Sequence, residues 1–220
     1  MPRRSKTKQR LLFRWGGRRR GSGRKPKGAQ AGVPHRIRPA LAARFPVHVT
    51  MVVERGLPSL RGRLTFRVVR GALADGCEKP GFRVVEYSVQ FNHIHLIAEG
   101  SCRERLARGM QGLGVRIAKR LNRFWQRRGR VFRDRYHDCI LRTPTEVRRA
   151  LVYVLQNARR HGVLLSRGAV DPCSSARWFG GWREWVASRG SPLPSARTWL
   201  LGLGWRCRGL LSISEVPRAG

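Results

Sequence analysis

The sequence predicts an α+β fold in which an antiparallel sheet carries helices on one face. Val-rich stretches that alternate in polarity, such as residues 45–54 and 82–91, are typical of strands. Stretches with apolar residues at helical spacing, such as 60–77 and 101–125, lie between or after them. Two strand-like stretches also follow each other directly, which predicts a hairpin within the sheet.

The first half of this domain supplies three strands and a helix. The segment FPVHVTMVVE, residues 45–54, is predicted as the first strand. Residues 82–91 and 93–99 are predicted as two more strands that join near Asn92. The helix between them is predicted because apolar residues recur near helical spacing, at Leu60, Leu64, Val68 and Leu73.

The second half is predicted as helix, strand and helix. Ser101, with Glu104 three residues later, predicts the N-cap of a helix over 101–125, although Gly109, Gly112 and Gly114 weaken its continuity. Residues 129–142 are predicted as a strand. The last helix is marked at its start by an N-cap, a proline and an acidic residue, and at its end by a glycine: Thr143, Pro144, Glu146 and Gly162.

The order strand, helix, strand, strand, helix, strand is that of a ferredoxin-like split βαβ domain, here followed by one further helix. We therefore divide the chain into a basic arm at 1–44, a folded domain at 45–162 and a C-terminal extension at 163–220. The extension holds five of the 7 tryptophans. Trp178, Trp182 and Trp185 are spaced as on one helix face, which favours packing on the domain over stacking on bases.

The charge predicts a polyanionic partner. The chain has 47 Lys and Arg against 12 Asp and Glu, a net charge of +35. Nucleic acid is favoured over an anionic membrane because the sequence has neither an amphipathic basic helix nor a lipidation signal. A small-molecule substrate is not expected. No apolar run approaches the roughly 18 residues of a membrane span. The 5 widely spaced cysteines indicate free thiols in a reducing cytoplasm. With nucleic acid as the expected partner, we expect a cytoplasmic, nucleoid-associated protein.

The arm is the most basic part of the chain, since the first acidic residue is Glu54. Its Gly, Arg and Lys content predicts disorder when it is free. Two interpretations stay open, an extended arm in the minor groove and a general phosphate-binding tail. The residues expected to contact nucleic acid are Arg18, Arg19, Arg20, Arg24, Lys25 and Lys27 in the arm, and Arg159 and Arg160 in the last helix.

Two histidines lie one residue apart in the strand NHIHLIAE. Side chains at i and i+2 of a strand point to the same face, so His93 and His95 are predicted to project together while Ile94 faces the core. Two neutral imidazoles on one face are suited to binding a divalent metal ion. The alternative is a pair of polar side chains on a solvated face.

A tyrosine and an amide follow in the last predicted helix. Tyr153 and Asn157 are four residues apart and share a helix face. This spacing can present a nucleophile beside a third metal ligand. The alternative is a core tyrosine on an amphipathic helix.

The combination resembles the single-tyrosine HUH transposases, and most of all the REP-associated tyrosine transposases. The resemblance rests on NHIHLIAE and on the block VFRDRYHDCILRTPTEVRRALVYVLQNARRHG, and it covers residues 45–162. It implies that Tyr153 is the nucleophile and that His93, His95 and Asn157 are the ligands of Mg²⁺ or Mn²⁺. Asn157 stands where the family has a Gln or Asn.

The resemblance also implies an activity, which is bacterial DNA transposition and recombination. Such enzymes cleave single-stranded or hairpin DNA through a 5′-phosphotyrosine intermediate and then rejoin it, as monomers or homodimers. Three alternatives remain open: a DDE-type transposase, for which the 12 acidic residues offer no convincing triad, a non-catalytic ferredoxin-like nucleic-acid-binding protein, and a domesticated element that has lost mobility.

Overall fold

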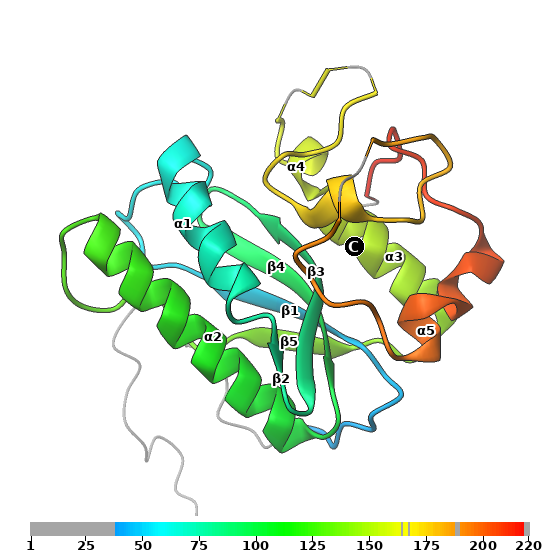
Figure 1. Cartoon of the computed structure of the whole chain (residues 1–220), viewed down its shortest axis with the longest axis horizontal. Helices are drawn as coiled ribbons and strands as arrows, with labels where there is room; N and C mark the ends of the chain where they lie inside the picture. Colours follow the sequence, from blue (N-terminus) through cyan, green and yellow to red (C-terminus); the bar gives the residue numbers. More distant parts are fainter. Residues whose placement is uncertain (1–37, 164, 167, 188–189, 218–220) are drawn as a thin grey trace, which may run out of the picture. The chain divides into compact units, whose positions relative to one another are not determined.

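The structure, a computed structural model, describes residues 38–163, 165–166, 168–187 and 190–217 (Figure 1). All of them belong to one compact unit, residues 35–220. The predicted disorder of the arm falls on residues outside those described, apart from 38–44.

A five-stranded sheet forms the centre of this unit. Every neighbouring pair is antiparallel, and the strand order is β2-β3-β4-β1-β5. With the short β2 set aside, this is the ferredoxin-like order, so the predicted fold class is confirmed. The strands are β1 (Val47–Val52), β2 (Glu78–Lys79), β3 (Phe82–Val89), β4 (His93–Gly100) and β5 (His137–Ile140).

Two long helices, α1 (Arg63–Ala74) and α2 (Arg103–Phe124), lie side by side on one face of the sheet (Figure 1). Alternate residues of the central strands point into the core below them, including Val49 of β1 and both Ile94 and Leu96 of β4. This alternation follows from the pleat of a strand. It leaves the intervening side chains of β1 and β4 free to face the other side.

Helix α2 differs from its prediction at two places. It runs without a break through Gly109. The glycine is needed there because the buried helix approaches β3 so closely that a Cβ atom would overlap the Phe82 ring. The predicted N-cap at Ser101 is wrong, since the N-cap is Cys102, without a side-chain hydrogen bond. The Ser101 amide donates to Gly81 across the hairpin, so the chain at Ser101 still belongs to the sheet edge.

Helix α3 (Pro144–Leu155) begins as predicted, with a capping box formed by Thr143 and Glu146. It stops earlier than predicted, and a short helix α4 (Asn157–Arg160) follows after Gln156. The buried Gln156 side chain donates to the carbonyls of Ser212 and Ile213, so the break coincides with its anchorage to the C-terminal segment. The C-cap of α4 is His161, and the predicted Gly162, at φ 72°, follows one residue later.

The other face of the sheet is covered by α3 and the described residues of 163–217, which we call the C-terminal segment. It contains η1 (Ser175–Trp178), α5 (Trp199–Gly202) and η2 (Gly204–Arg208). These elements form a second core with Val85 and Ile97 of the sheet. The second core holds α3 in place, and α3 carries Tyr153.

The predicted tryptophan stripe is wrong, because residues 175–185 do not form one helix. Trp178 ends η1, Trp182 pairs with Leu211 in an isolated bridge, and Trp185 is 87% exposed. The packing role holds for Trp182 and Trp205, whose indole N–H groups donate to carbonyls inside the second core. Tertiary contacts have overridden the helical spacing here.

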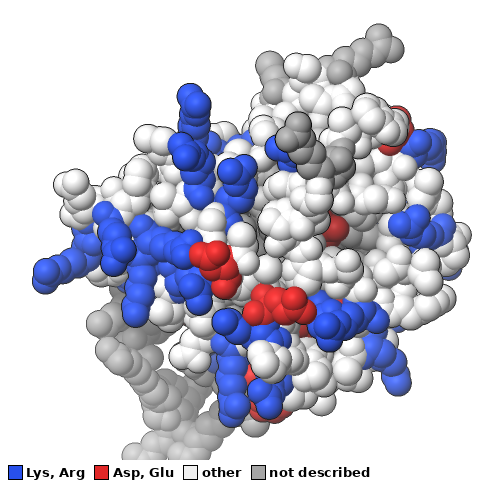
Figure 2. All heavy atoms as spheres, in the orientation of Figure 1, with Lys and Arg blue, Asp and Glu red and all other residues white. Residues whose placement is uncertain are grey.

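Basic side chains dominate the described surface. In Figure 2 they gather over the α1 and α2 side of the molecule, with few acidic residues between them. The exposed ones of these two helices are Arg63, Arg67, Arg70, Arg105, Arg108, Lys119 and Arg123. Within the part of the chain that the structure describes, no helix is both long and apolar enough to cross a membrane.

Candidate active site

The histidine pair lies on the face of the sheet that α3 covers. His93 and His95 share that face of β4, with ring centroids 4.7 Å apart and ring planes nearly perpendicular. Ile94 is fully buried on the opposite face, under α1 and α2. The geometry predicted from the two-residue period of a strand is therefore observed.

Tyr153 comes from α3 to the same place. Its ring meets the His95 ring edge-on, with a centroid distance of 5.0 Å. The Arg160 guanidinium carbon lies 5.4 Å from the centre of the Tyr153 ring. The structure thus brings Tyr153 to His93 and His95, from which it is about 60 residues away in the sequence.

Two residues of β1, His48 and Thr50, also belong to this cluster and were missed in the sequence, and the His161 ring lies 5.3 Å from that of His93. β1 pairs with β4 so that Thr50 lies opposite His95. The Thr50 hydroxyl is 3.1 Å and the His48 Nε2 atom 3.3 Å from His95 Nδ1. The signal was the alternation in VHVTM, which places both side chains on one strand face, but nothing local reveals which strand is the neighbour.

These contacts orient the His95 ring. Nδ1 has two polar neighbours, whereas the buried Nε2 has no hydrogen-bond partner among the described residues. If Nδ1 carries the proton and donates it to Thr50 or His48, the Nε2 lone pair is left free. A histidine that binds a metal ion commonly donates its other ring N–H in this way.

The site keeps its histidines uncharged. Burial, joined by the charges of His93, His48 and other neighbours, lowers the pKa of His95 to about 2. Burial and the nearby His161 lower the pKa of His93 to about 4, and burial alone lowers the pKa of His48 to about 4. All three imidazoles are therefore neutral at pH 7, which is the form that binds a metal ion.

Asn157 is the first residue of α4 and is fully buried. Neither its amide nitrogen nor its amide oxygen has a hydrogen-bond partner among the described residues. A buried amide without partners is costly, and such a group calls for a bound water, ion or ligand. The Tyr153 and Asn157 pair is separated by the helix break at Gln156 rather than lying on one continuous helix.

The donor set fits a small divalent cation in its chemistry. The free nitrogen of His95 and the oxygen of Asn157 are buried lone pairs without partners, and His93 stands beside His95. Imidazole and amide oxygen suit Mn²⁺, and the oxygen suits Mg²⁺. Among the described residues, no group of three or more His, Cys, Asp or Glu side chains is placed to hold a metal ion, so the amide would be needed as a ligand.

The predicted nucleic-acid contacts are distributed unevenly. Arg160 lies over Tyr153, within the cluster. Arg159 instead hydrogen-bonds inside the protein, to the Gln156 side chain and the Ala169 carbonyl. The arm residues Arg18, Arg19, Arg20, Arg24, Lys25 and Lys27 lie outside the described residues.

Fold and cluster together define a class of protein: a ferredoxin-like sheet whose second face presents a histidine pair from a central strand to a tyrosine from the helix after the last strand. Comparisons by sequence find no protein-family model and no curated protein that matches this chain. Comparison of structures does find similar chains.

One of them is described as the structure of a REP-associated tyrosine transposase bound to a REP hairpin. The alignment covers 65% of this chain and 82% of that one, with a TM-score of 0.51 and 15% sequence identity. At this identity the likeness establishes a shared fold. It agrees with the family that the sequence motifs resemble.

Proposed function

We propose that this protein is a DNA strand transferase of the single-tyrosine HUH type, which cleaves and rejoins single-stranded DNA through a 5′-phosphotyrosine. One observation carries the proposal: Tyr153 lies against His95, whose buried Nε2 has no partner, and α4 directly after this helix begins with the equally unpartnered Asn157. A structural cluster would be expected to satisfy these polar atoms.

His93, His95 and Asn157 would hold a Mg²⁺ or Mn²⁺ ion. When bound, such an ion would withdraw negative charge from the scissile phosphate and orient it. Because all three ligands are neutral, the site keeps the full positive charge of the ion for the phosphate. Thr50 and His48 fix the tautomer of His95, and Arg160 adds a positive charge beside the tyrosine.

Tyr153 performs the covalent step. Its oxygen forms a bond to phosphorus as the bond from phosphorus to the 3′ oxygen breaks; the phenol loses a proton and the departing 3′ oxygen gains one. The reverse reaction, attack by a 3′-OH on the phosphotyrosine, restores Tyr153 and joins the strands. The bond energy is kept in the ester, so no nucleotide cofactor is needed.

DNA is the proposed partner on grounds of charge and fold. The net charge of +35 calls for a polyanion, and the structural neighbour is bound to a hairpin. A single strand or a hairpin with single-stranded flanks is favoured because the tyrosine must approach a phosphate from within a half-buried cluster. We extend the hairpin substrate from the neighbour to this chain as part of the proposal.

The test uses the three tyrosines of the chain as a matched set. Purified full-length protein, hairpin DNA with single-stranded flanks and Mn²⁺ should give an adduct that survives denaturation. Tyr153→Phe should abolish it, by about a thousandfold or more, because no other group takes over a missing nucleophile. Tyr87→Phe and Tyr136→Phe should keep it, since these tyrosines pack with the helix-side core.

Two outcomes would count against the proposal. An adduct or cleavage that persists in Tyr153→Phe would remove the tyrosine from the chemistry, and cleavage without any adduct would favour the DDE alternative. Tight binding without any adduct from the unchanged protein would favour the non-catalytic nucleic-acid-binding alternative.

A further inference from the structure

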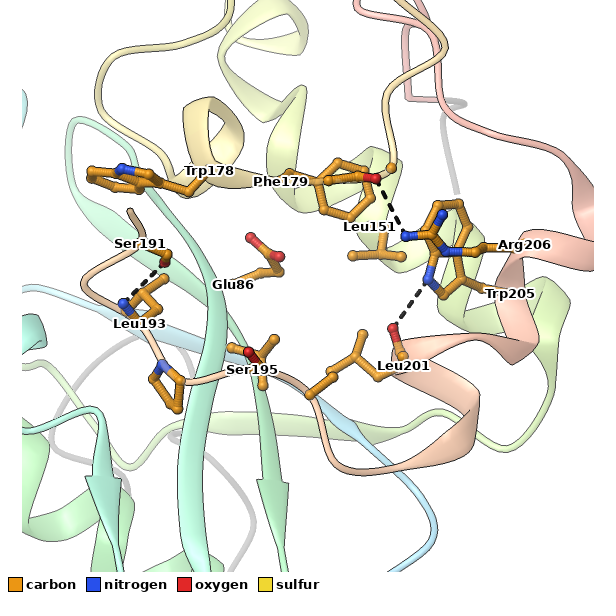
Figure 3. A pocket seen from close by; sticks show the side chains of 16 residues that line it. Glu86, Leu151, Trp178, Phe179, Ser191, Leu193, Ser195, Leu201, Trp205 and Arg206 are labelled. Carbon is orange, nitrogen blue, oxygen red and sulfur yellow. Dashed lines mark hydrogen bonds between the residues drawn. The ribbon is translucent and has the colours of Figure 1, made fainter. Parts of the chain in front are cut away.

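A cavity of about 300 Å³ lies between the sheet, α3 and the C-terminal segment, and its lining includes no residue of the tyrosine cluster. Figure 3 shows its walls, with the carboxyl group of Glu86 pointing into the open space. Trp178, Phe179 and Trp205 contribute aromatic walls, and Arg206 is the cationic residue of the lining.

Glu86 reaches this cavity through a β-bulge. The pairing of β3 with β4 shifts register between Val84 and Glu86. As a result Val85 and Glu86 both line the cavity, whereas Val84 and Tyr87 on either side point into the helix-side core. Bulges of this kind redirect a side chain and are frequent beside functional sites.

The Glu86 carboxyl group has few hydrogen-bond partners in the protein. Among the residues that the structure describes, its hydrogen-bond donor is the hydroxyl of Ser175. Burial raises the pKa of Glu86 to about 8. An apolar residue here would avoid the cost of desolvating a carboxyl, and the Glu86 carboxyl points into the cavity and not into packed side chains.

The lining matches the chemistry of a single nucleobase. A base has two apolar faces that pack on aromatic side chains and an edge that must be hydrogen-bonded. The cavity volume of about 300 Å³ is sufficient for one base. Arg206 is exposed and can contact the attached phosphate, while Glu86 lies where the edge of the base would be.

The position of the cavity connects it with the proposed reaction. In the ladder of β3 and β4, Ser88 pairs with His95 and Glu86 pairs with Ile97. Glu86 therefore lies diagonally across from His95 on the neighbouring strand, roughly 7–8 Å away, on the same face. A strand whose phosphate lies at Tyr153 can place a neighbouring base here.

We propose that this cavity binds one unpaired base of the substrate strand, and that the Glu86 carboxyl accepts a hydrogen bond from the exocyclic amino group of adenine, cytosine or guanine. Either protonation state of the carboxyl keeps an oxygen that can accept this bond. Thymine has no exocyclic amino group to donate this bond. This inference rests on the proposed function for its substrate.

The test is a binding preference measured on the full chain without any cleavage. Short single strands of deoxyadenosine or deoxycytidine should bind about fivefold more tightly than thymidine strands, which is the value of one hydrogen bond. Glu86→Leu should remove this preference and leave thymidine binding unchanged. Glu86→Gln should keep it, because its carbonyl still accepts. Fluorescence anisotropy of labelled strands measures all of these.

A second measurement needs no variant and so does not depend on how Glu86→Leu folds. Deoxycytidine strands can be compared with strands of the same base lacking its amino group, 2-pyrimidinone. The unchanged protein should bind the latter as weakly as thymidine. A preference that survives Glu86→Leu, or indifference of the unchanged protein to the amino group, would overturn the proposal.

The outcome is separable from that of the proposed function. Tyr153→Phe should keep the base preference while it loses the adduct. If the adduct forms normally but substitution of Glu86 does not change the base preference, only the proposed base-binding role of the cavity is ruled out. A clear preference without any adduct removes the transferase and leaves a base-binding protein.

Discussion

At the scale of single residues, His95 shows how a strand neighbour can orient the metal ligand that we propose. Its Nδ1 atom lies near Thr50 and His48 on β1, while its Nε2 atom is buried without a partner. Under the proposed function the two ring nitrogens have different tasks: Nδ1 orients the ring and Nε2 binds the ion. The strand period was sufficient to predict that His93 and His95 share a face, but the β1 partners depend on sheet pairing.

Glu86 is a residue whose titration should change the stability of the protein with pH. Burial raises its pKa from the ordinary value of 4.5 to about 8, so between these pH values the folded protein holds a proton that the unfolded chain has released. Stability therefore falls as the pH rises from about 4.5 to about 8, and the loss is complete above that range.

Glu86→Gln removes this proton linkage. Relative to the unchanged protein, the variant should gain stability between pH 5 and pH 9, by on the order of a few kcal/mol. Urea unfolding at a series of pH values measures the difference. Glu104→Gln is the control: a hydrogen bond with Cys102 lowers the pKa of Glu104, so its variant should show no such gain. A pH-independent difference for Glu86→Gln would show that the carboxyl is not held protonated.

At the scale of elements, α2 is defined by how closely it approaches the sheet. Gly109 and Gly112 lie in the same helix, but a Cβ at Gly109 would overlap the Phe82 ring, while one at Gly112 meets nothing within 4 Å. The sequence treats the two glycines alike, as weak points of a helix. Only the packing separates their roles.

These two glycines give a matched pair of variants. Gly109→Ala should destabilise the protein by roughly 1–3 kcal/mol, because the methyl group forces α2 and Phe82 apart. Gly112→Ala should stabilise it by about 0.5–1 kcal/mol, since alanine is the better helix former at an exposed position. Thermal and urea unfolding measure both. Equal effects of the two substitutions would contradict the close approach of α2 to β3.

Elements with strong local signals were predicted well from the sequence. The capping box of Thr143 and Glu146 marks the start of α3 because its hydrogen bonds are made within one turn. The end of α3 was missed, since Gln156 is held by carbonyls of a segment more than 50 residues later. The tryptophan spacing misled for the same reason, as Trp182 pairs with Leu211 instead of continuing a helix.

The tyrosine site was predictable to the extent that local periods and the family resemblance place its residues. His93, His95 and Tyr153 were found in this way. Glu86 was not, because a β-bulge breaks the strand period and turns the carboxyl to the second face. A bulge is set by how two strands pair, which the sequence of one strand does not reveal.

At the scale of the whole molecule, function depends on how the two faces of one sheet are used. The face under α1 and α2 is closed by a packed core, with basic side chains on the outer surface of the helices (Figure 2). The second face holds the tyrosine cluster and the Glu86 cavity between α3 and the C-terminal segment. The buried ion pair of Arg61 with Asp171 ties this segment to the loop before α1.

Because the net charge is +35, DNA binding should depend on salt, and this dependence can distinguish contacts made by the arm from contacts made by α1 and α2. Each phosphate contact to a single strand adds about 0.7 to the slope of log K against log salt. Replacing the six predicted arm residues by alanine, at positions 18, 19, 20, 24, 25 and 27, should therefore lower the slope by about 4 if all six contact the strand.

The matched control removes six exposed basic residues from α1 and α2: Arg63, Arg67, Arg70, Arg105, Arg108 and Lys119. These lie on the helix side of the sheet, away from Tyr153, so a short strand bound at the tyrosine cannot reach them. Their replacement should change the slope for a short single strand by less than about 1. If both variants lower the slope equally, the arm acts only as general positive charge. If the helix variant lowers the slope more, the single strand binds on α1 and α2.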